Sequence, residues 1–206
     1  QGRGAMSFCC SVPFLLALAL SAAFCSSRWL ALLWLAAGVH EMGHLLAARL
    51  LGVRVKRVCF RLSGMELQLD GRRLSYGQEA LLALAGPGAN LLLCLLTALR
   101  PSLWRMLLCG CSLALGGFNL LPALPLDGGR ALRAMLLRRW PEQGERIVCC
   151  CGAVCGLVLT AAGLYFGKAQ GNLSLLAAGC AIFSALPGKK LYTRRKNRYN
   201  KKSSER

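Results

Sequence analysis

Acidic residues are scarce in this chain of 206 residues. It has eight aspartates and glutamates against 26 lysines and arginines, and charged residues make up only 17% of the total. A soluble domain usually carries charge on about a quarter of its residues. Hydrophobic residues reach 55% and come in long runs, where a soluble domain would scatter them at helical or strand spacing. The composition therefore argues against an ordinary soluble domain and indicates a membrane protein.

Paired CxxC knuckles are also missing, although the chain has twelve cysteines. Most of the cysteines lie in or beside apolar runs, as at 109–111 and 149–155, where cysteine behaves as a small hydrophobic residue. We assign them no function. The net charge of +18 would suggest nucleic-acid binding in a soluble protein, yet no sequence typical of a nucleic-acid-binding fold accompanies it. We expect no nucleic-acid partner.

Six apolar segments approach or reach the roughly 20 residues that a helix needs to cross a bilayer. The first could be a signal peptide, but only Arg3 precedes it and the next apolar run starts at Trp29, so we expect a retained span. The predicted fold is an all-α polytopic membrane protein, with a six-span core over 1–188 and a basic tail over 189–206. The six spans cover about 11–27, 29–51, 80–99, 103–126, 147–166 and 171–187.

Basic residues gather on alternate connections between these segments. They are concentrated after the second, fourth and sixth segments, whereas the opposite side carries only Arg28, Arg100, Arg105 and Lys168. Basic connections mark the cytoplasmic side of a membrane protein. We therefore expect a cell-membrane protein with both termini in the cytoplasm and with its tail against the anionic surface of the lipid bilayer.

The connection after the second segment alternates apolar and polar residues around two turn signals, Ser63-Gly64 and Asp70-Gly71. Alternation with a period of two is typical of strands, and the glycines favour turns between them. We predict a short β-hairpin-like loop at the membrane interface.

Histidine is as scarce as aspartate, since the chain has only two of each. Both of them, His40 and His44, lie in the second apolar segment together with Glu41, and Asp127 lies at the edge of the fourth. A carboxylate at the centre of a membrane helix costs about 2.5–3.5 kcal/mol. These groups are therefore expected to have partners and a function.

The histidines are four residues apart, so on a helix they share one face and can bind one metal ion. In this HExxH pattern the imidazoles bind zinc, and the glutamate takes a proton from water and delivers it to the leaving amine. A catalytic zinc needs a third protein ligand, and Asp127 is the remaining buried carboxylate. One zinc ion with Asp127 and Glu41 sums to zero charge, which favours burial. A simpler alternative is a chance match whose histidines serve helix contacts.

The depth of this site follows from helix geometry. Arg49 lies five to nine residues beyond the histidines, or roughly 7–14 Å along a helix. We therefore expect a site within the membrane but toward its cytoplasmic side.

The fourth segment should lose its helix ahead of Asp127, because Pro122 and Pro125 each remove a backbone donor and disfavour helix before them. Gly128 and Gly129 would then allow a tight turn. Non-helical backbone at membrane depth is tolerated only where protein or a water-filled cavity lines it. An active site offers such surroundings.

Two motifs in this order resemble the hallmarks of the site-2 protease family of intramembrane zinc metalloproteases. They are His-Glu-Met-Gly-His at 40–44 and Asn-Leu-Leu-Pro-Ala-Leu-Pro-Leu-Asp-Gly-Gly at 119–129, and the resemblance covers about 29–130. It implies one zinc ion and a catalytic glutamate. The implied zinc ligands are His40, His44 and Asp127, and the implied acid/base is Glu41.

The same resemblance implies that Asn119 and Pro125 position the substrate near zinc. Leu126 stands between the proline and the aspartate, a variant that is similar to the sporulation branch, the stage IV sporulation FB proteases. That branch would imply a pro-sigma factor as substrate. A weaker family element, Gly-Pro-Gly-Ala-Asn at 86–90, would let helices approach closely, and its Asn90 would hydrogen-bond across the interface or bind substrate.

The predicted function is zinc-dependent intramembrane cleavage of a membrane-embedded or membrane-tethered regulatory protein, with a regulatory membrane protein as a further candidate partner. The alternative is a non-proteolytic membrane protein that binds or transports metal, for which His40, His44 and Asp127 would suffice. Glu41 discriminates between the two, because a carrier has little need of a base beside its ligands. An inactive relative that guides clients without cutting them is a third interpretation.

Overall fold

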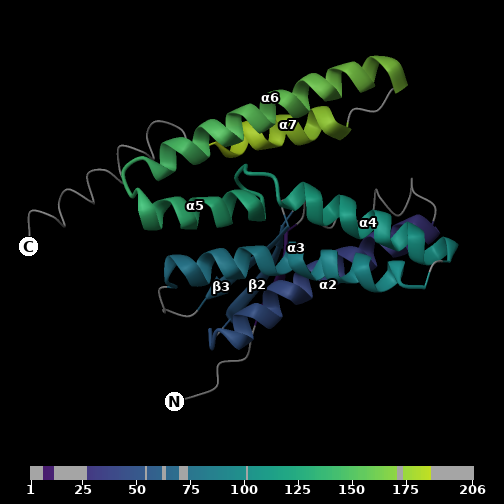
Figure 1. Cartoon of the computed structure of the whole chain (residues 1–206), viewed down its shortest axis with the longest axis horizontal. Coiled ribbons are helices and arrows are strands. Elements are labelled where there is room, and N and C mark those ends of the chain that lie inside the picture. The colour runs from purple at the N-terminus through teal and green to yellow at the C-terminus, as the bar shows by residue number, and fades with distance from the viewer. Residues whose placement is uncertain are drawn as a thin grey trace, which may run out of the picture.

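The computed structural model describes residues 7–11, 27–53, 55–61, 64–69, 74–100, 102–170 and 174–186. Most of the first predicted span and the whole basic tail lie outside this part. Within it the chain forms six helices and a three-stranded sheet (Figure 1). The mostly helical fold agrees with the predicted class.

Helices α2 (Ser27–Leu50) and α3 (Tyr76–Ala98) pack side by side. Ser75 caps α3 by accepting from the Gln78 backbone, while the Gln78 side chain accepts from the Ser75 N–H. Close approach depends on small residues, since a Cβ at Gly43 would lie 2.5 Å from the Ala85 carbonyl oxygen. The α2 segment that carries both histidines therefore lies directly against α3.

Helices α4 (Leu103–Asn119) and α5 (Asp127–Arg139) are separated by a non-helical segment, 120–126, in which the Leu124–Pro125 peptide is cis. The break confirms that the helix ends ahead of Asp127, although it ends at Asn119 and not at the predicted 126. Helix α5 was not predicted. The aspartate is its first residue.

The tight turn predicted at Gly128 and Gly129 is wrong, because both residues lie in the first turn of α5. A Cβ at Gly128 would overlap the Leu120 carbonyl oxygen, and one at Gly129 would lie within 2.6 Å of the Leu124 nitrogen. The glycines therefore let the 120–126 segment fold back against the start of α5. This contact fixes where the helix, and with it Asp127, begins.

Helices α6 (Gly144–Gln170) and α7 (Ser174–Ala185) lie alongside each other and form a layer beside α5 (Figure 1). Arg133 of α5 donates to both carboxylate oxygens of Glu145 at the start of α6, with Nε 3.1 Å from each oxygen. These hydrogen bonds raise the pKa of the Arg133 guanidinium. The ion pair ties the helix that begins at Asp127 to the α6–α7 layer.

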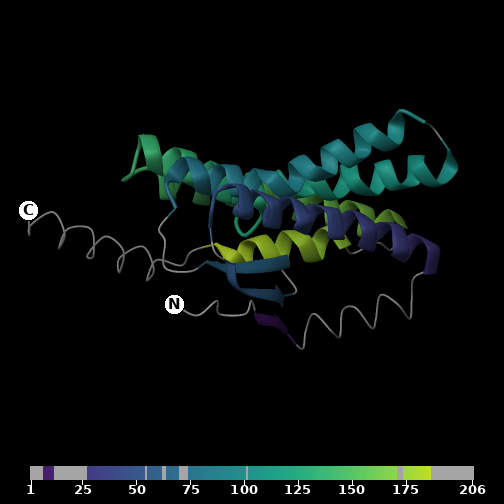
Figure 2. The ribbon, with the colours of Figure 1, turned by 90° about the horizontal axis from the view of Figure 1, so that it is seen from below.

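The sheet has the order β1-β2-β3, from β1 (Ser7–Cys10), β2 (Val55–Arg61) and β3 (Gly64–Leu69). It lies beside the helices (Figure 2). Strands β2 and β3 pair antiparallel within the connection where strand alternation was predicted. Strand β1 adds in parallel to β2 and was not predicted.

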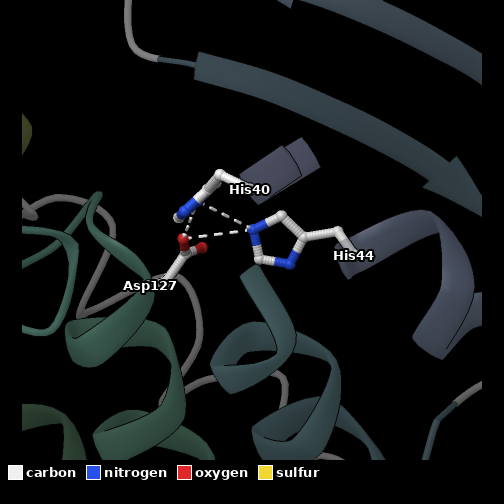
Figure 3. A group of neighbouring side chains, drawn as sticks. All are labelled: His40, His44 and Asp127. Atoms are coloured by element: carbon white, nitrogen blue, oxygen red, sulfur yellow. Dashed lines mark hydrogen bonds and ion pairs between the residues drawn. The ribbon is translucent and has the colours of Figure 1, made fainter. Parts of the chain in front are cut away.

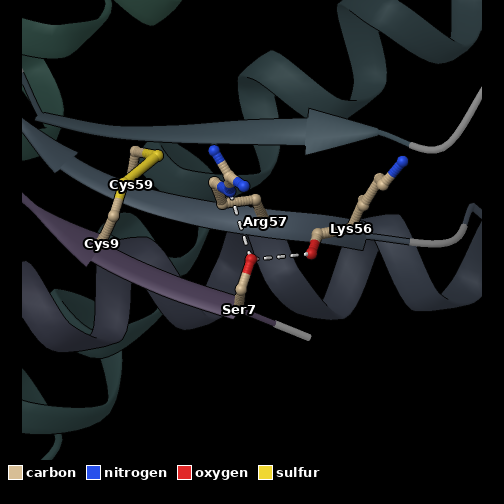
Figure 4. The surroundings of a disulfide bond; sticks show 5 residues. All are labelled: Ser7, Cys9, Lys56, Arg57 and Cys59. Carbon is tan, nitrogen blue, oxygen red and sulfur yellow. Dashed lines mark hydrogen bonds between the residues drawn. A yellow bond between two sulfur atoms is a disulfide. The ribbon is translucent and has the colours of Figure 1, made fainter. Parts of the chain in front are cut away.

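Side-chain contacts join β1 to β2 beyond the backbone ladder (Figure 4). Cys9 and Cys59 form a disulfide, and Ser7 Oγ accepts from Arg57 Nε at 3.2 Å. A second disulfide joins Cys94 of α3 to Cys109 of α4. No role was predicted for these cysteines, so both pairings are additional structural ties.

Polar and apolar side chains are distributed as in a membrane protein. Large hydrophobic residues cover the helix surfaces, with Leu95 61% and Leu157 64% exposed, whereas the buried positions include His40, His44, Asn90, Ser112 and Asp127. In lipid, small residues and polar contacts hold helices together while large apolar side chains face outward. The apolar surface therefore supports a membrane location.

Three of the described helices are long and apolar enough to cross a membrane: Arg28–Leu50, Tyr76–Ala98 and Gly144–Lys168. They correspond to the second, third and fifth predicted spans. Ser174–Ala185 is a shorter apolar helix, and α4 has 17 residues. The predicted total of six spans therefore stays a prediction.

Candidate metal centre

Three buried side chains from two helices far apart in sequence meet at one point (Figure 3). His40 and His44 extend from one face of α2, and Asp127 reaches them from the start of α5. The Oδ2 atom of Asp127 lies 3.0 Å from His40 Nε2 and 3.2 Å from His44 Nε2, and the two Nε2 atoms are 3.2 Å apart. All three residues are at most 7% exposed.

This donor set fits zinc. Tetrahedral zinc with bonds of about 2.0–2.1 Å separates its ligand atoms by roughly 3.3–3.4 Å, close to the separations of 3.0–3.2 Å found here. Two imidazole nitrogens and one carboxylate oxygen also form the group of potential metal ligands in the described part of the chain. Three protein ligands leave a fourth position for water or substrate.

Gly86 of α3 forms the floor beneath the two histidines. A Cβ at this position would lie 2.7 Å from His40 Nε2 and closer still to His44 Nε2. The absent side chain therefore keeps space beside the ligand nitrogens. The prediction that small residues in 86–90 permit close helix approach is confirmed here, but the importance of this glycine to the metal centre was missed.

The outward-facing nitrogen of each histidine also has a partner. His44 Nδ1 lies 2.8 Å from the carbonyl oxygen of Leu82, and a carbonyl can only accept, so Nδ1 carries the hydrogen. The Nε2 lone pair is then free for a metal ion. His40 Nδ1 lies 3.2 Å from Nδ2 of Asn90, which is fully buried in α3.

Asp127 uses its two oxygens differently. Oδ2 faces the histidines, whereas Oδ1 accepts from Nη1 of Arg130 at 3.3 Å. Arg130 is one turn further along α5 and is partly exposed. It was counted only as a basic residue of a connection, because the helix that brings it to Asp127 was not predicted.

Glu41 follows His40 in α2 and is partly buried. One residue turns a helix by roughly 100°, so Glu41 stands beside the ligand face and not on it. It is near enough to His44 for the two groups to interact electrostatically. This position suits a base next to a metal centre better than a ligand.

Asn119 and Pro125 occupy the two ends of the break between α4 and α5. Asn119 Nδ2 donates to the Leu115 carbonyl oxygen at 3.0 Å, and Pro125 is exposed. Neither belongs to the hydrogen-bonded group around the histidines in the part of the chain that is described. Of the three residues predicted to bind substrate, only Asn90 joins that group.

Comparison with known proteins finds matches to zinc metalloproteases. Residues 100–159 match Peptidase family M50. The chain is 27% identical over 164 residues to zinc metalloprotease MJ0392 of Methanocaldococcus jannaschii, covering 74% of this chain and 46% of that protein. It is 35% identical over 168 residues to Rip3 of Mycobacterium tuberculosis, assigned as a zinc metalloprotease, covering 71% and 42%. The chain thus spans less than half the length of these relatives.

A solved structure agrees with these matches. The site-2 protease from Methanocaldococcus jannaschii superposes with a TM-score of 0.61 and 25% sequence identity, over 90% of this chain and 91% of that one. The relatives' zinc chemistry matches a donor set of two histidines and an aspartate. The family match, the curated relatives and the solved structure agree: the chain is similar to peptidase family M50, to zinc metalloproteases and to a site-2 protease.

Proposed function

We propose that this chain forms the membrane core of a zinc-dependent intramembrane endopeptidase. Its substrate would be a membrane-embedded or membrane-tethered regulatory protein. One observation carries the proposal: the buried side chains of His40 and His44 contact Asp127, which lies 83 residues beyond His44. Such groups are costly in a membrane unless they pair or bind a metal. The zinc metalloproteases among the relatives support the same chemistry.

The chain's own residues divide the work of peptide hydrolysis. Bound zinc would act as a Lewis acid and would lower the pKa of a water molecule bound to it to about 7. His40, His44 and Asp127 would hold the ion. Glu41 would accept the proton of the attacking water and pass it to the nitrogen of the breaking peptide bond, which leaves as an amine. Asn119 and Pro125 would position the substrate backbone along the 120–126 segment.

Glu41→Gln tests the proposal against a metal-binding or transport role. We expect the variant to keep its zinc and to lose cleavage of a co-expressed substrate by at least about 100-fold, because proton transfer contributes 10²–10⁴-fold. Cleavage is read as a size shift on a gel, and zinc by elemental analysis of the purified protein.

Glu142→Gln is the matched control, since it makes the same chemical change at an exposed residue outside the site. It should cleave as the wild type does. Undiminished cleavage by the Glu41 variant would remove Glu41 from the mechanism. Loss of both zinc and cleavage would show instead that Glu41 maintains the metal centre.

Finer parts of the proposal rest on sequence patterns. Basic connections support a cell-membrane protein whose core at 1–188 is followed by a tail at 189–206. They also support six spans, with both termini and the tail in the cytoplasm.

The order proline, Leu126, Asp127 supports the sporulation branch and a pro-sigma factor as substrate. Co-expression with candidate membrane-associated pro-sigma factors and regulatory membrane proteins tests this branch, and absence of a size shift with every candidate would count against it.

A further inference from the structure

Asn90 is a fully buried polar side chain next to the proposed zinc site. It extends from α3 and exposes none of its surface, and its Nδ2 lies 3.2 Å from His40 Nδ1. Its other amide atom, Oδ1, is also buried and has no hydrogen-bond partner among the described residues. The amide therefore faces a histidine and not an open surface, so its surroundings do not favour contact with a substrate.

Only one of the two ring nitrogens of His40 can bind the metal ion, and the other must then carry a hydrogen. A neutral imidazole has one N–H donor and one lone-pair acceptor. If Nε2 binds zinc, Nδ1 must carry the hydrogen and needs an acceptor. His44 meets this condition through the fixed carbonyl of Leu82. His40 has no such carbonyl partner in the described part of the chain, and Asn90 occupies the corresponding position.

We propose that Asn90 is a positioning residue that holds His40 in its zinc-binding tautomer. A half-turn of the amide about the Cβ–Cγ bond exchanges Nδ2 and Oδ1, and Oδ1 then accepts from His40 Nδ1–H. This exchange gives the otherwise unpartnered amide oxygen a hydrogen bond. The inference rests on the proposed zinc site and assigns to Asn90 a role other than substrate binding.

An amide suits this position because it can donate and accept. In the arrangement observed, Nδ2 donates to Nδ1, and His40 Nε2 carries the hydrogen that faces Asp127 Oδ2 at 3.0 Å. With Nε2 bound to zinc, that hydrogen leaves Nε2, another is taken up at Nδ1, and the turned amide accepts it. The imidazole is neutral in both states. Asn90 can thus match His40 with and without metal.

Zinc affinity of the purified full chain tests the inference without any need for a substrate. Metal-depleted protein in detergent is titrated with zinc against a chelating indicator. We compare wild type with Asn90→Leu, which can neither donate nor accept, and with Asn90→Asp, which keeps an acceptor. Losing a partner of a metal-bound histidine typically weakens binding by about 10–100-fold, which is the loss expected for the leucine variant. The aspartate variant should bind within about threefold of wild type or more tightly.

Ser112→Ala is the matched control. Ser112 of α4 is also fully buried, and its Oγ has no hydrogen-bond partner in the described part of the chain. Its removal should leave zinc affinity unchanged. A similar loss in this variant would indicate general damage to packing and would overturn the specific role of Asn90.

The remaining outcomes also decide the question. Unchanged zinc affinity in Asn90→Leu overturns the inference and returns Asn90 to substrate binding or packing. Equal losses in the leucine and aspartate variants also overturn it, because an acceptor should rescue binding. If the leucine variant does not fold, the aspartate variant decides alone, and a loss of about tenfold or more counts against the role. A wild-type chain that binds no zinc would instead overturn the proposed function itself.

Discussion

Gly86 has no room for a side chain. Its Cα faces the ligand nitrogens of both histidines across a gap that a single methyl group would fill. The imidazoles cannot retreat easily, because their outer nitrogens are held by Leu82 and Asn90. The smallest substitution at this residue should therefore act directly on the metal centre.

We predict that Gly86→Ala weakens zinc binding by at least about tenfold, as loss of ligand orientation typically does. Gly88→Ala is the control on the same helix, because a Cβ there meets nothing within 4 Å. That control should keep wild-type zinc affinity and gain up to about 1 kcal/mol of helix stability. Zinc titration of both purified variants makes the comparison. Equal affinities would show that the space beside the histidines is not needed.

At the scale of single residues, the sequence predicts the side chains that are chemically unusual for a membrane segment. Two histidines, four residues apart in an apolar helix, and one buried aspartate could be singled out because such groups are costly in a membrane. Gly86 and Asn90 could be placed only on a helix interface, because their contacts join α3 to α2, and no spacing rule sets the rotation of one helix against another. Arg130 was missed because its contact with Asp127 depends on the unpredicted helix α5.

The element that controls the position of Asp127 is α5. Its sequence carried the signals of a helix, an acidic residue in the first turn and Arg138 and Arg139 in the last. The segment nevertheless resembles a cytoplasmic connection, because it follows an apolar run and is rich in arginine. Strand β1 was missed for another reason, since four residues pair with a strand about 50 positions away. Such pairing has no local signature.

Glu145→Gln tests how far the Arg133–Glu145 ion pair secures α5. Both side chains are mostly buried, at 22% and 23% exposed, and truncating one partner leaves the other charge without compensation. We expect the free energy of unfolding to fall by about 1–3 kcal/mol, between the values for surface and fully buried pairs. A lower midpoint of thermal denaturation in detergent is the measurement.

The exposed Glu142→Gln provides the control for this experiment and should leave the midpoint unchanged. The double variant Arg133→Met, Glu145→Leu should recover much of the loss, because apolar residues of similar volume can replace such a pair. An unchanged midpoint in Glu145→Gln would mean that α5 is held by its other contacts with α3 and α6.

At the scale of the whole molecule, the distribution of charge predicts an orientation in the membrane. The basic connections predict a cytoplasmic tail. A fluorescent protein fused after Arg206 should therefore fold and fluoresce in a bacterial host, whereas alkaline phosphatase at the same position should be inactive. Active phosphatase would reverse the predicted orientation and place the site nearer the opposite side.

Zinc would join α2 to α5 through three residues, so the site would tie together two helices that are far apart in the sequence. The most direct measurement of this claim is the zinc content of the purified full chain, by elemental analysis, for wild type and Asp127→Ala. We expect one zinc ion per wild-type chain and little or none in the variant, since two histidines alone bind zinc weakly at a site built for three ligands. A wild-type chain without zinc, or an Asp127→Ala variant with undiminished zinc, would contradict it.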